Sequence, residues 1–194
     1  SISDDEGETC NTPINITNNQ AYNARLTTVL YESKVYVAVS SKIDDIQSDI
    51  MLYYSDNFGQ DWEEPINVSD NSGASSRPDI NLVHSENSDR IYLTWCDDTY
   101  TATSQAYISY SFDNGQTWEE FQQISEITEN AYWAKNIIQP GQTTDEIFAV
   151  WNQPDAGTFD FHVWGRKGTN LLTELGTLEG MVVDNQDNPL EAVT

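Results

Sequence analysis

Acidic and aromatic side chains gather between the apolar runs of this sequence, and their chemistry suits ligand binding. The candidate ligand contacts among them are Asp97, Asp98, Tyr100, Tyr132 and Trp133. Aromatic rings stack on the apolar faces of sugars, and carboxylates accept hydrogen bonds from sugar hydroxyls. Carboxylate oxygens also bind calcium, although no D-x-[DN]-x-[DN]-G loop followed by Glu is present, and no other cofactor is expected. A solvated acidic rim is the alternative interpretation.

Three cations form a second candidate group, because each begins a corresponding extended segment. They are Arg25, Arg77 and Lys135. A guanidinium group binds a carboxylate in bidentate fashion, so an anion site is one interpretation of this group. Pairing with acids of the same chain is the other. His84 and His162 lack the spacing of metal ligands or of a catalytic triad, and no catalytic residue can be assigned.

A sequence repeat of 56 residues shows where these candidate residues lie relative to the expected strands. Runs rich in Val, Ile, Tyr and Trp begin at 35, 91 and 147, and a second set begins at 50, 106 and 162. Extended segments open the units at 24–31, 77–84 and 134–139, and short ones close the first two units at 64–69 and 120–125. Each unit is therefore expected to contain four strands, separated by segments rich in Gly, Asn, Asp and Pro.

Four antiparallel strands repeated at this interval predict an all-β fold built from β-propeller blades. We expect three blades, over about 22–70, 74–126 and 131–178, after an N-terminal segment over 1–21. Propellers close with four or more blades, so other chains or further chain segments are needed to complete one. A β-sandwich of similar strands is the alternative.

One short motif occurs twice and carries a resemblance to a known family. It reads SDNFGQDW over 55–62 and SFDNGQTW over 111–118. The motif resembles the Asp-box, or bacterial neuraminidase repeat, of sialidases and related propellers. The residues that carry the resemblance are Ser55, Asn57, Gly59, Trp62, Ser111, Asp113, Gly115 and Trp118. The third unit has no such motif near 167–174.

The resemblance implies a structural role for these residues, in a turn between the third and fourth strands that lies away from the ligand. It implies a ligand site at the opposite end of the blades, where Arg25, Arg77 and Lys135 are expected near the axis. Sialidases bind the carboxylate of their substrate with arginines. No Tyr-Glu nucleophile pair can be assigned in this chain.

The last residues of the chain carry a second resemblance. LEGMVVDNQDNPLEAVT, over 178–194, resembles the first strand and turn of a carboxypeptidase-regulatory-like domain. The match is carried by Gly180, Val182, Asp184, Pro189 and Leu190. It implies that 179–194 begins a following β-sandwich domain. A strand exchanged with another chain is the alternative.

The amino-acid composition limits the kinds of partner that the chain can bind and indicates its cellular compartment. Eight Lys and Arg face 32 Asp and Glu, which gives a net charge of -24. Such a chain repels nucleic acid and anionic membranes, and no apolar run reaches the roughly 18 residues that span a bilayer. Cys10 and Cys96 are the two cysteines. One pair in an acidic, Lys-poor chain indicates a disulfide and an extracellular or cell-surface location, with two reduced, buried thiols as the alternative.

These patterns favour an extracellular, sialidase-like propeller segment that acts as a binding or scaffolding module. Glycans or other surface proteins are its expected partners. One alternative is part of an exo-sialidase or another glycoside hydrolase. Another is an adhesin or filament subunit that assembles through strand edges. The question of catalysis stays open, with a non-enzymatic role favoured.

Overall fold

The computed structural model describes residues 8–9, 12–18, 22–84, 89–126, 129–141, 144–158, 160–171 and 182–183. All secondary structure in these residues is β-strand, and no helix there has the length and hydropathy needed to cross a membrane. The first sheet has the order β1 (Asn23–Tyr31), β2 (Lys34–Lys42), β3 (Ser48–Ser55), β4 (Ile66–Asn67).

The second and third sheets repeat the same antiparallel order. The second contains β5 (Ser76–Val83), β6 (Arg90–Asp97), β7 (Gln105–Ser111) and β8 (Gln122–Gln123). The third contains β9 (Tyr132–Gln139), β10 (Thr144–Pro154), β11 (Phe161–Leu171) and β12 (Val182–Val183). The expected all-β fold of three four-stranded blades is therefore confirmed.

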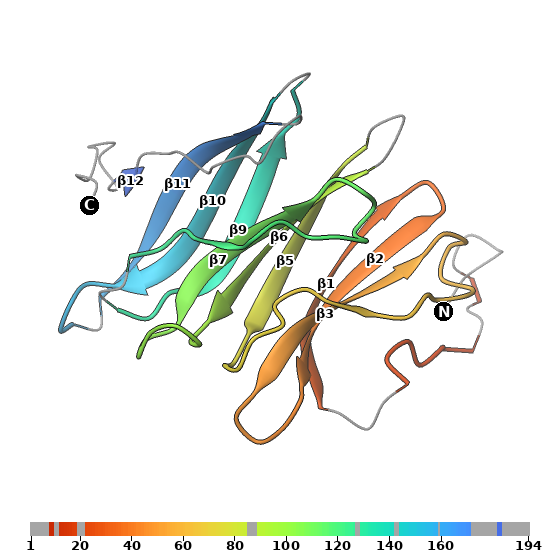
Figure 1. Ribbon diagram of the computed structural model, residues 1–194, viewed down its shortest axis with the longest axis horizontal. Helices are drawn as coiled ribbons and strands as arrows, with labels where there is room; N and C mark the ends of the chain where they lie inside the picture. Colours follow the sequence, from red (N-terminus) through yellow and green to blue (C-terminus); the bar gives the residue numbers. More distant parts are fainter. Residues whose placement is uncertain are drawn as a thin grey trace.

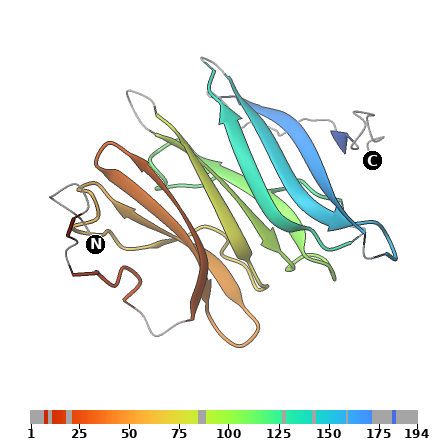
Figure 2. The same cartoon turned by 180° about the vertical axis from the view of Figure 1, so that it is seen from behind.

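The three sheets stand side by side as blades, with the second between the other two (Figure 1). The first strand of each sheet is the innermost, and β1, β5 and β9 lie next to one another (Figure 2). The sheets do not close into a ring among the described residues. The arrangement is a partial propeller.

The core consists of two seams between neighbouring sheets, with a smaller cluster of Val37, Val39 and Tyr53 on the outer face of the first sheet. Tyr36 and Leu52 of the first sheet meet Leu93 and Trp95 of the second, and all four are at most 1% exposed. The other seam joins Tyr92 and Ile108 of the second sheet to Ala134, Ala149 and Trp151 of the third sheet. Trp95 and Trp151 stand 56 residues apart and are both 1% exposed. The sequence repeat therefore reflects the same large side chain filling successive seams.

The fourth strands are short. β4 and β8 contain two residues each, inside the longer segments expected at 64–69 and 120–125. In the third sheet the fourth strand comes from the segment that the sequence assigns to a following domain or an exchanged strand. There Val182 and Val183 pair with Arg166 and Gly165 of β11.

The structure corrects the expectation of a disulfide between Cys10 and Cys96. Cys96 is a free thiol in β6, fully buried in the seam between the second and third sheets beside Ala131 and Ala134. Burial raises the pKa of this thiol, which keeps it protonated and unreactive. Cys10 lies outside the described residues.

Ion pairs cross each seam at corresponding positions. Lys34 Nζ lies 2.7 Å from Asp89 Oδ2, and Arg90 Nε lies 2.7 Å from Asp145 Oδ2. Both aspartate side chains are fully buried. Asp145 also accepts hydrogen bonds from Tyr92 Oη at 2.5 Å and from the Gly141 amide at 3.0 Å. These carboxylates tie the beginning of each second strand to the sheet that follows it.

Removing the buried carboxylate of Asp145 should destabilise the fold, because Arg90 and Tyr92 then lose their acceptor. We expect Asp145→Ala to lower the free energy of unfolding by about 3–5 kcal/mol, the usual cost of breaking a buried pair. Asp45→Ala is the control, since its pair with Lys42 is exposed and should contribute about 0–1 kcal/mol. Urea unfolding followed by tryptophan fluorescence measures both; equal losses would contradict the role given to Asp145.

Acid should weaken the same contacts. Burial alone would raise the pKa of Asp145, but hydrogen bonds from Arg90 and Tyr92 outweigh it and hold that pKa below its ordinary value. The Asp145 contribution is therefore present above the unfolded pKa of about 3.9 and is lost as pH falls through the folded pKa. Thermal melts from neutral to acid pH should show this loss in wild type and less of it in Asp145→Ala. Parallel curves for the two proteins would contradict the assignment.

Candidate functional site

The turn over 111–118 is held by hydrogen bonds among its own residues. Ser111 Oγ accepts the Gly115 amide at 2.9 Å and donates to Asp113 Oδ1 at 2.8 Å. Asp113 accepts the Thr117 amide at 2.8 Å and the Thr117 hydroxyl at 2.6 Å. Trp118 Nε1 donates to the Gly115 carbonyl at 3.1 Å. Burial would raise the pKa of Asp113, but the bonds from Thr117 and Ser111 outweigh it and lower that pKa.

The turn over 55–62 repeats this arrangement with different side chains. Ser55 Oγ accepts the Gly59 amide at 2.8 Å, and Asn57 Oδ1 accepts the Asp61 amide at 2.9 Å. Asn57 Nδ2 donates to the Asp61 carboxylate, and Trp62 Nε1 donates to the Gly59 carbonyl. The amide of Asn57 thus replaces the carboxylate of Asp113 as acceptor. The polar groups of both turns serve the turns themselves.

An open hollow lies at the opposite end of the sheets, where β1, β5 and β9 begin. The pairing of Val35 with Ser55 and of Ala24 with Ser40 puts the turns and the hollow at opposite ends. The hollow has a volume of about 330 Å³. Its lining residues are Arg25, Leu26, Arg77, Pro78, Trp133, Ala134 and Lys135. It therefore brings together four of the residues proposed as ligand contacts from the sequence.

A β-bulge aims one side chain from each inner strand at this hollow. The strand register shifts at Arg25 in β1, at Arg77 in β5 and at Trp133 in β9. These residues have φ angles of 52°, 58° and 51°. Such a left-handed conformation costs about 1–3 kcal/mol at a non-glycine residue and concentrates at functional sites. The bulge is thus a feature shared by all three blades.

This register changes one grouping expected from the sequence. Lys135 lies two residues beyond the bulge, and Trp133 is the true counterpart of Arg25 and Arg77. The counterpart of Lys135 in the second sheet is Asp79, and the two form an ion pair of 2.8 Å. Lys135 therefore lies at the edge of the hollow with its charge compensated.

Arg77 lies next to two adjacent aromatic rings. The centre of its guanidinium lies 5.3 Å from the Tyr132 ring centroid and 5.2 Å from that of Trp133, which fits cation–π contacts. Its hydrogen bond to Ser76 Oγ is long, at 3.4 Å, and its buried Nε has no partner among the described residues. Burial, and after it the positive charge of Arg25, lowers the pKa of Arg77.

Most cations of the chain pair with acids, whereas the two arginines of the hollow do not. The cations with a carboxylate within 4.0 Å are Lys34, Lys42, Arg90, Lys135 and Lys167. Within the described residues Arg25, Arg77 and Arg166 have no such partner, and of these three only Arg25 and Arg77 line the hollow. Acids are in fourfold excess, 32 against 8, so a shortage of carboxylates does not explain the difference.

Three further candidates from the sequence lie outside the hollow. Asp97 is buried and accepts hydrogen bonds from Asn71 Nδ2 at 2.7 Å and Ser75 Oγ at 2.5 Å, so it anchors the connection between the first two sheets. Asp98 accepts the Ala74 amide at 2.7 Å in the same connection. Tyr100 is 60% exposed, and its ring centroid lies 5.8 Å from that of Phe121.

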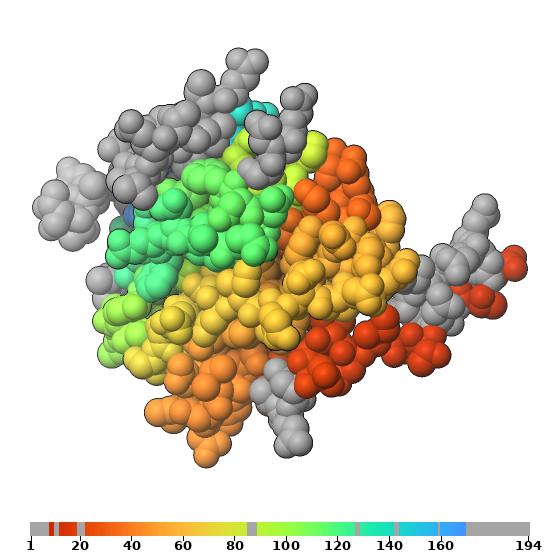
Figure 3. Space-filling view, turned by 45° about the vertical axis from the view of Figure 1, so that its right-hand side comes forward, coloured from red at the N-terminus to blue at the C-terminus, as the bar shows by residue number. Residues whose placement is uncertain are grey.

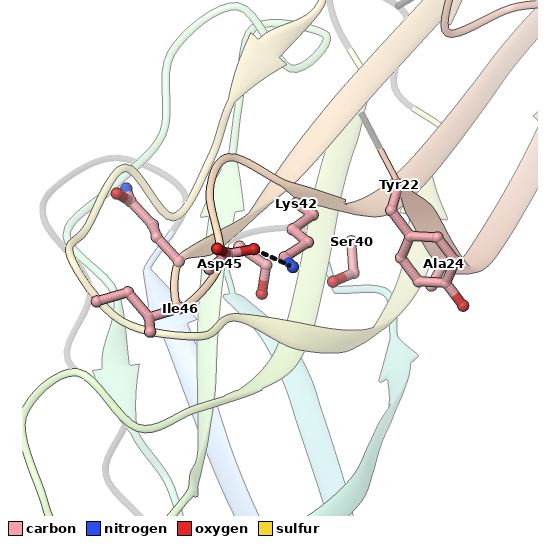
Figure 4. A pocket seen from close by; sticks show the side chains of 8 residues that line it. Tyr22, Ala24, Ser40, Lys42, Asp45 and Ile46 are labelled. Carbon is pink, nitrogen blue, oxygen red and sulfur yellow. Dashed lines mark hydrogen bonds and ion pairs between the residues drawn. The ribbon is translucent and has the colours of Figure 1, made fainter. Parts of the chain in front are cut away.

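A second, smaller hollow was not expected from the sequence. It has a volume of about 210 Å³ and is lined by Tyr22, Ala24, Ser40, Lys42, Asp45, Ile46, Gln47 and Ser48. Lys42 and Asp45 form a 3.2 Å ion pair across it (Figure 4). Asp44, next to this hollow, accepts the amides of Gln47 and Ile46, and these bonds lower its pKa. With its charges paired, this hollow offers no free cation.

The histidines and acids do not assemble a metal site in the part of the chain that the structure describes. No group of three or more His, Cys, Asp or Glu side chains there could hold a metal ion. His84 Nδ1 lies 2.9 Å from Asp89 and its ring stacks on Tyr31. His162 Nε2 lies 3.1 Å from Asp155. Each histidine has a structural partner of its own.

Comparison with known proteins adds little to this geometry. No family model and no curated protein matches the chain. One similar solved structure is that of an α-L-arabinanase from Penicillium chrysogenum, complexed with arabinobiose, at 14% sequence identity and a TM-score of 0.48. The likeness covers 80% of this chain and 47% of the arabinanase chain, so it spans about half of that protein. At this level it supports no conclusion about function.

The hydrogen bonds of the turn predict that Asp113 stabilises the fold. Asp113→Ala should lower the free energy of unfolding by about 1–3 kcal/mol, because the Thr117 amide and the Ser111 hydroxyl lose a charged acceptor. Asp113→Asn should lose clearly less, since Asn57 already fills this place in the other turn. Chemical denaturation measures the order of the three proteins. An Asn variant as unstable as the Ala variant would contradict the account.

Proposed function

We propose that this chain is a binding module that holds an anionic sugar by its carboxylate, in the hollow at Arg25, Arg77 and Trp133. The observation that carries the proposal is the pair of uncompensated arginines in a chain of net charge -24. Two guanidiniums close enough for one to lower the pKa of the other repel each other, and a bound carboxylate relieves that repulsion.

The aromatic residues support a sugar as the carrier of the anion. Trp133 is 56% exposed and lines the hollow, so its ring is available to a ligand. Aromatic rings contact the apolar faces of sugars, while arginine side chains bind the charged group. The volume of about 330 Å³ falls at the small end of typical ligand pockets, which suits a single sugar unit.

The resemblance of the two turns to the Asp-box supports a sialidase-like propeller as the class of this module. In that class the ligand end lies opposite the turns, which is where Arg25 and Arg77 stand in this chain. Sialic acid is then the first candidate ligand, since it joins a carboxylate to a sugar ring. An extracellular or cell-surface location with glycan partners belongs to the same proposal.

Binding is favoured over hydrolysis by the side chains of the hollow. Retaining glycosidases place two carboxyl groups about 5–5.5 Å apart at the scissile bond, and inverting ones about 6.5–9.5 Å. The residues that line this hollow include no Asp or Glu. Asp79, at its edge, is engaged by Lys135 and by the Asn136 amide. A glycoside hydrolase would therefore need acids from beyond these lining residues.

The proposal predicts the effect of single substitutions on affinity for the methyl glycoside of sialic acid. Arg77→Ala should weaken binding about tenfold to hundredfold, because it removes a charged hydrogen bond worth about 1.5–3 kcal/mol. Lys135→Ala is the control and should change affinity far less, since its charge is already paired with Asp79. Isothermal titration calorimetry at low salt measures all three proteins.

A chemical control distinguishes recognition of the carboxylate from nonspecific binding of the glycoside. The methyl ester of the same glycoside should bind as weakly as the acid binds to Arg77→Ala. Equal affinity for acid and ester, or an unchanged Arg77→Ala, would contradict the proposal. Turnover of a fluorogenic sialoside by wild type and not by Arg77→Ala would replace the binding role with an enzymatic one.

A further inference from the structure

The outer face of the third sheet lacks a cover that its counterparts have. Tyr36 and Tyr92 occupy the same place in the first two sheets, and both are 0% exposed beneath the sheet that follows. Phe148 occupies this place in the third sheet and is 43% exposed. Its neighbours on that face, Ile137 and Val163, are 67% and 66% exposed. The repeat itself thus indicates that another sheet belongs on this face.

The first sheet has a complementary exposed strip on its own outer face, along its inner strand β1. Leu30 is 58% exposed, whereas its counterparts Leu82 and Ile138 pack against the preceding seam. Leu26, on the same face, is 68% exposed. Ile16 packs on the outer strands of this sheet, and Figure 3 shows the described N-terminal segment in red beside it. The inner-strand leucines are left open.

Neither open face carries the high negative charge of the chain. On the first sheet the exposed residues of this face are Leu26 and Leu30 of β1, while Val37 and Val39 of β2 are already buried in a cluster with Ile16. The outward ionisable residues of the third sheet are Lys135, Glu146 and Lys167; Lys167 pairs with Glu146 and Lys135 with Asp79, so this face carries no excess negative charge. In a protein with a net charge of -24, another copy can approach these two faces with less repulsion than a strongly acidic surface would cause.

The residues that form the ion pairs between sheets are replaced at the two unpaired positions, one in the first sheet and one in the third. Lys34 and Arg90 reach Asp89 and Asp145 of the following sheet. In the third sheet Glu146 takes the place of the cation, and in the first sheet Ser33 takes the place of the aspartate. A third contact of this kind would bring Glu146 to Ser33, whose hydroxyl can donate to a carboxylate. An aspartate at position 33 would repel Glu146 instead.

We propose that a second copy of this chain covers both open faces. The third sheet of each copy packs on the first sheet of the other, which closes a two-fold symmetric ring of two chains and six sheets. Head-to-tail contacts that close in this way give discrete assemblies, and six blades lie within the usual range for propellers. The inner strands of both copies then share one axis, so the partner's arginines face the same central space. The assembly itself requires no ligand.

Mass measurement of the full chain tests the assembly independently of ligand binding. Sedimentation equilibrium should give twice the 21.9 kDa of one chain. Phe148→Glu and Leu30→Glu each place a charge on one of the two faces, and each should raise the dissociation constant at least a hundredfold. Circular dichroism and a cooperative thermal melt confirm that both variants stay folded.

Mixing distinguishes the ring from a symmetric contact between two third sheets. In the ring both variants dissociate, and their equimolar mixture regains association through the one intact interface. A contact between two third sheets would leave Leu30→Glu dimeric and would overturn the proposal. A wild-type chain that stays monomeric at high micromolar concentration would overturn it too.

A charge cycle tests the contact itself without altering the apolar faces. Ser33→Asp, in the turn between β1 and β2, should weaken the dimer by opposing Glu146 of the other copy. The double variant S33D/E146K should restore it, because the new pair copies that of Arg90 with Asp145. E146K alone is the matched control and should stay associated. Failure of the double variant to recover association would show that these positions do not meet.

Discussion

Each four-stranded sheet of this chain is apolar on both faces, and the burial of those faces in seams is the constraint on which the rest depends. Trp95 and Trp151 fill successive seams and are almost inaccessible to water. Burying a large side chain contributes about 1.5–3 kcal/mol, and a sheet that stood alone would forfeit this on both sides. Stacking is therefore obligatory, and it brings the innermost strands β1, β5 and β9 together. The candidate site is a consequence of that stacking.

The seams also hold the strained backbone at which the site is built. The bulges at Arg25, Arg77 and Trp133 keep left-handed φ angles that isolated strands would not retain. In the second and third sheets a fully buried tryptophan lies opposite the bulge. The ion pairs of Asp89 and Asp145 fix the other end of the same sheets. The free-energy cost of the left-handed backbone at the bulges is thus offset by buried packing and by ion pairs elsewhere in the sheets.

The sequence predicted the strands well, because buried aromatic residues must recur at a constant interval when blades stack. It also brought Arg25 and Arg77 to one place, since both open their inner strands. It misassigned their third counterpart, because a bulge is a backbone feature that leaves no residue signature, and Trp133 rather than Lys135 occupies it. The disulfide expectation was wrong, since counting cysteines cannot reveal that Cys96 faces a closed seam. The sequence did indicate a strand in 179–194, but β12 pairs with β11 of the third sheet, a partner that a pattern within two residues cannot specify.

At the repeated bulge, the fold requires the backbone conformation, and a ligand would select only the side chain. All three inner strands adopt the same backbone there, yet the side chains are two arginines and a tryptophan. The backbone conformation is therefore a property of the blade, while the side chain is free to vary. Arg90 has a carboxylate partner in Asp145, whereas Arg25, Arg77 and Arg166 have none within 4.0 Å among the described residues. Arg25 and Arg77 differ from Arg166 in that they line one open hollow together, and with acids outnumbering cations fourfold this argues that their partner comes from outside the chain.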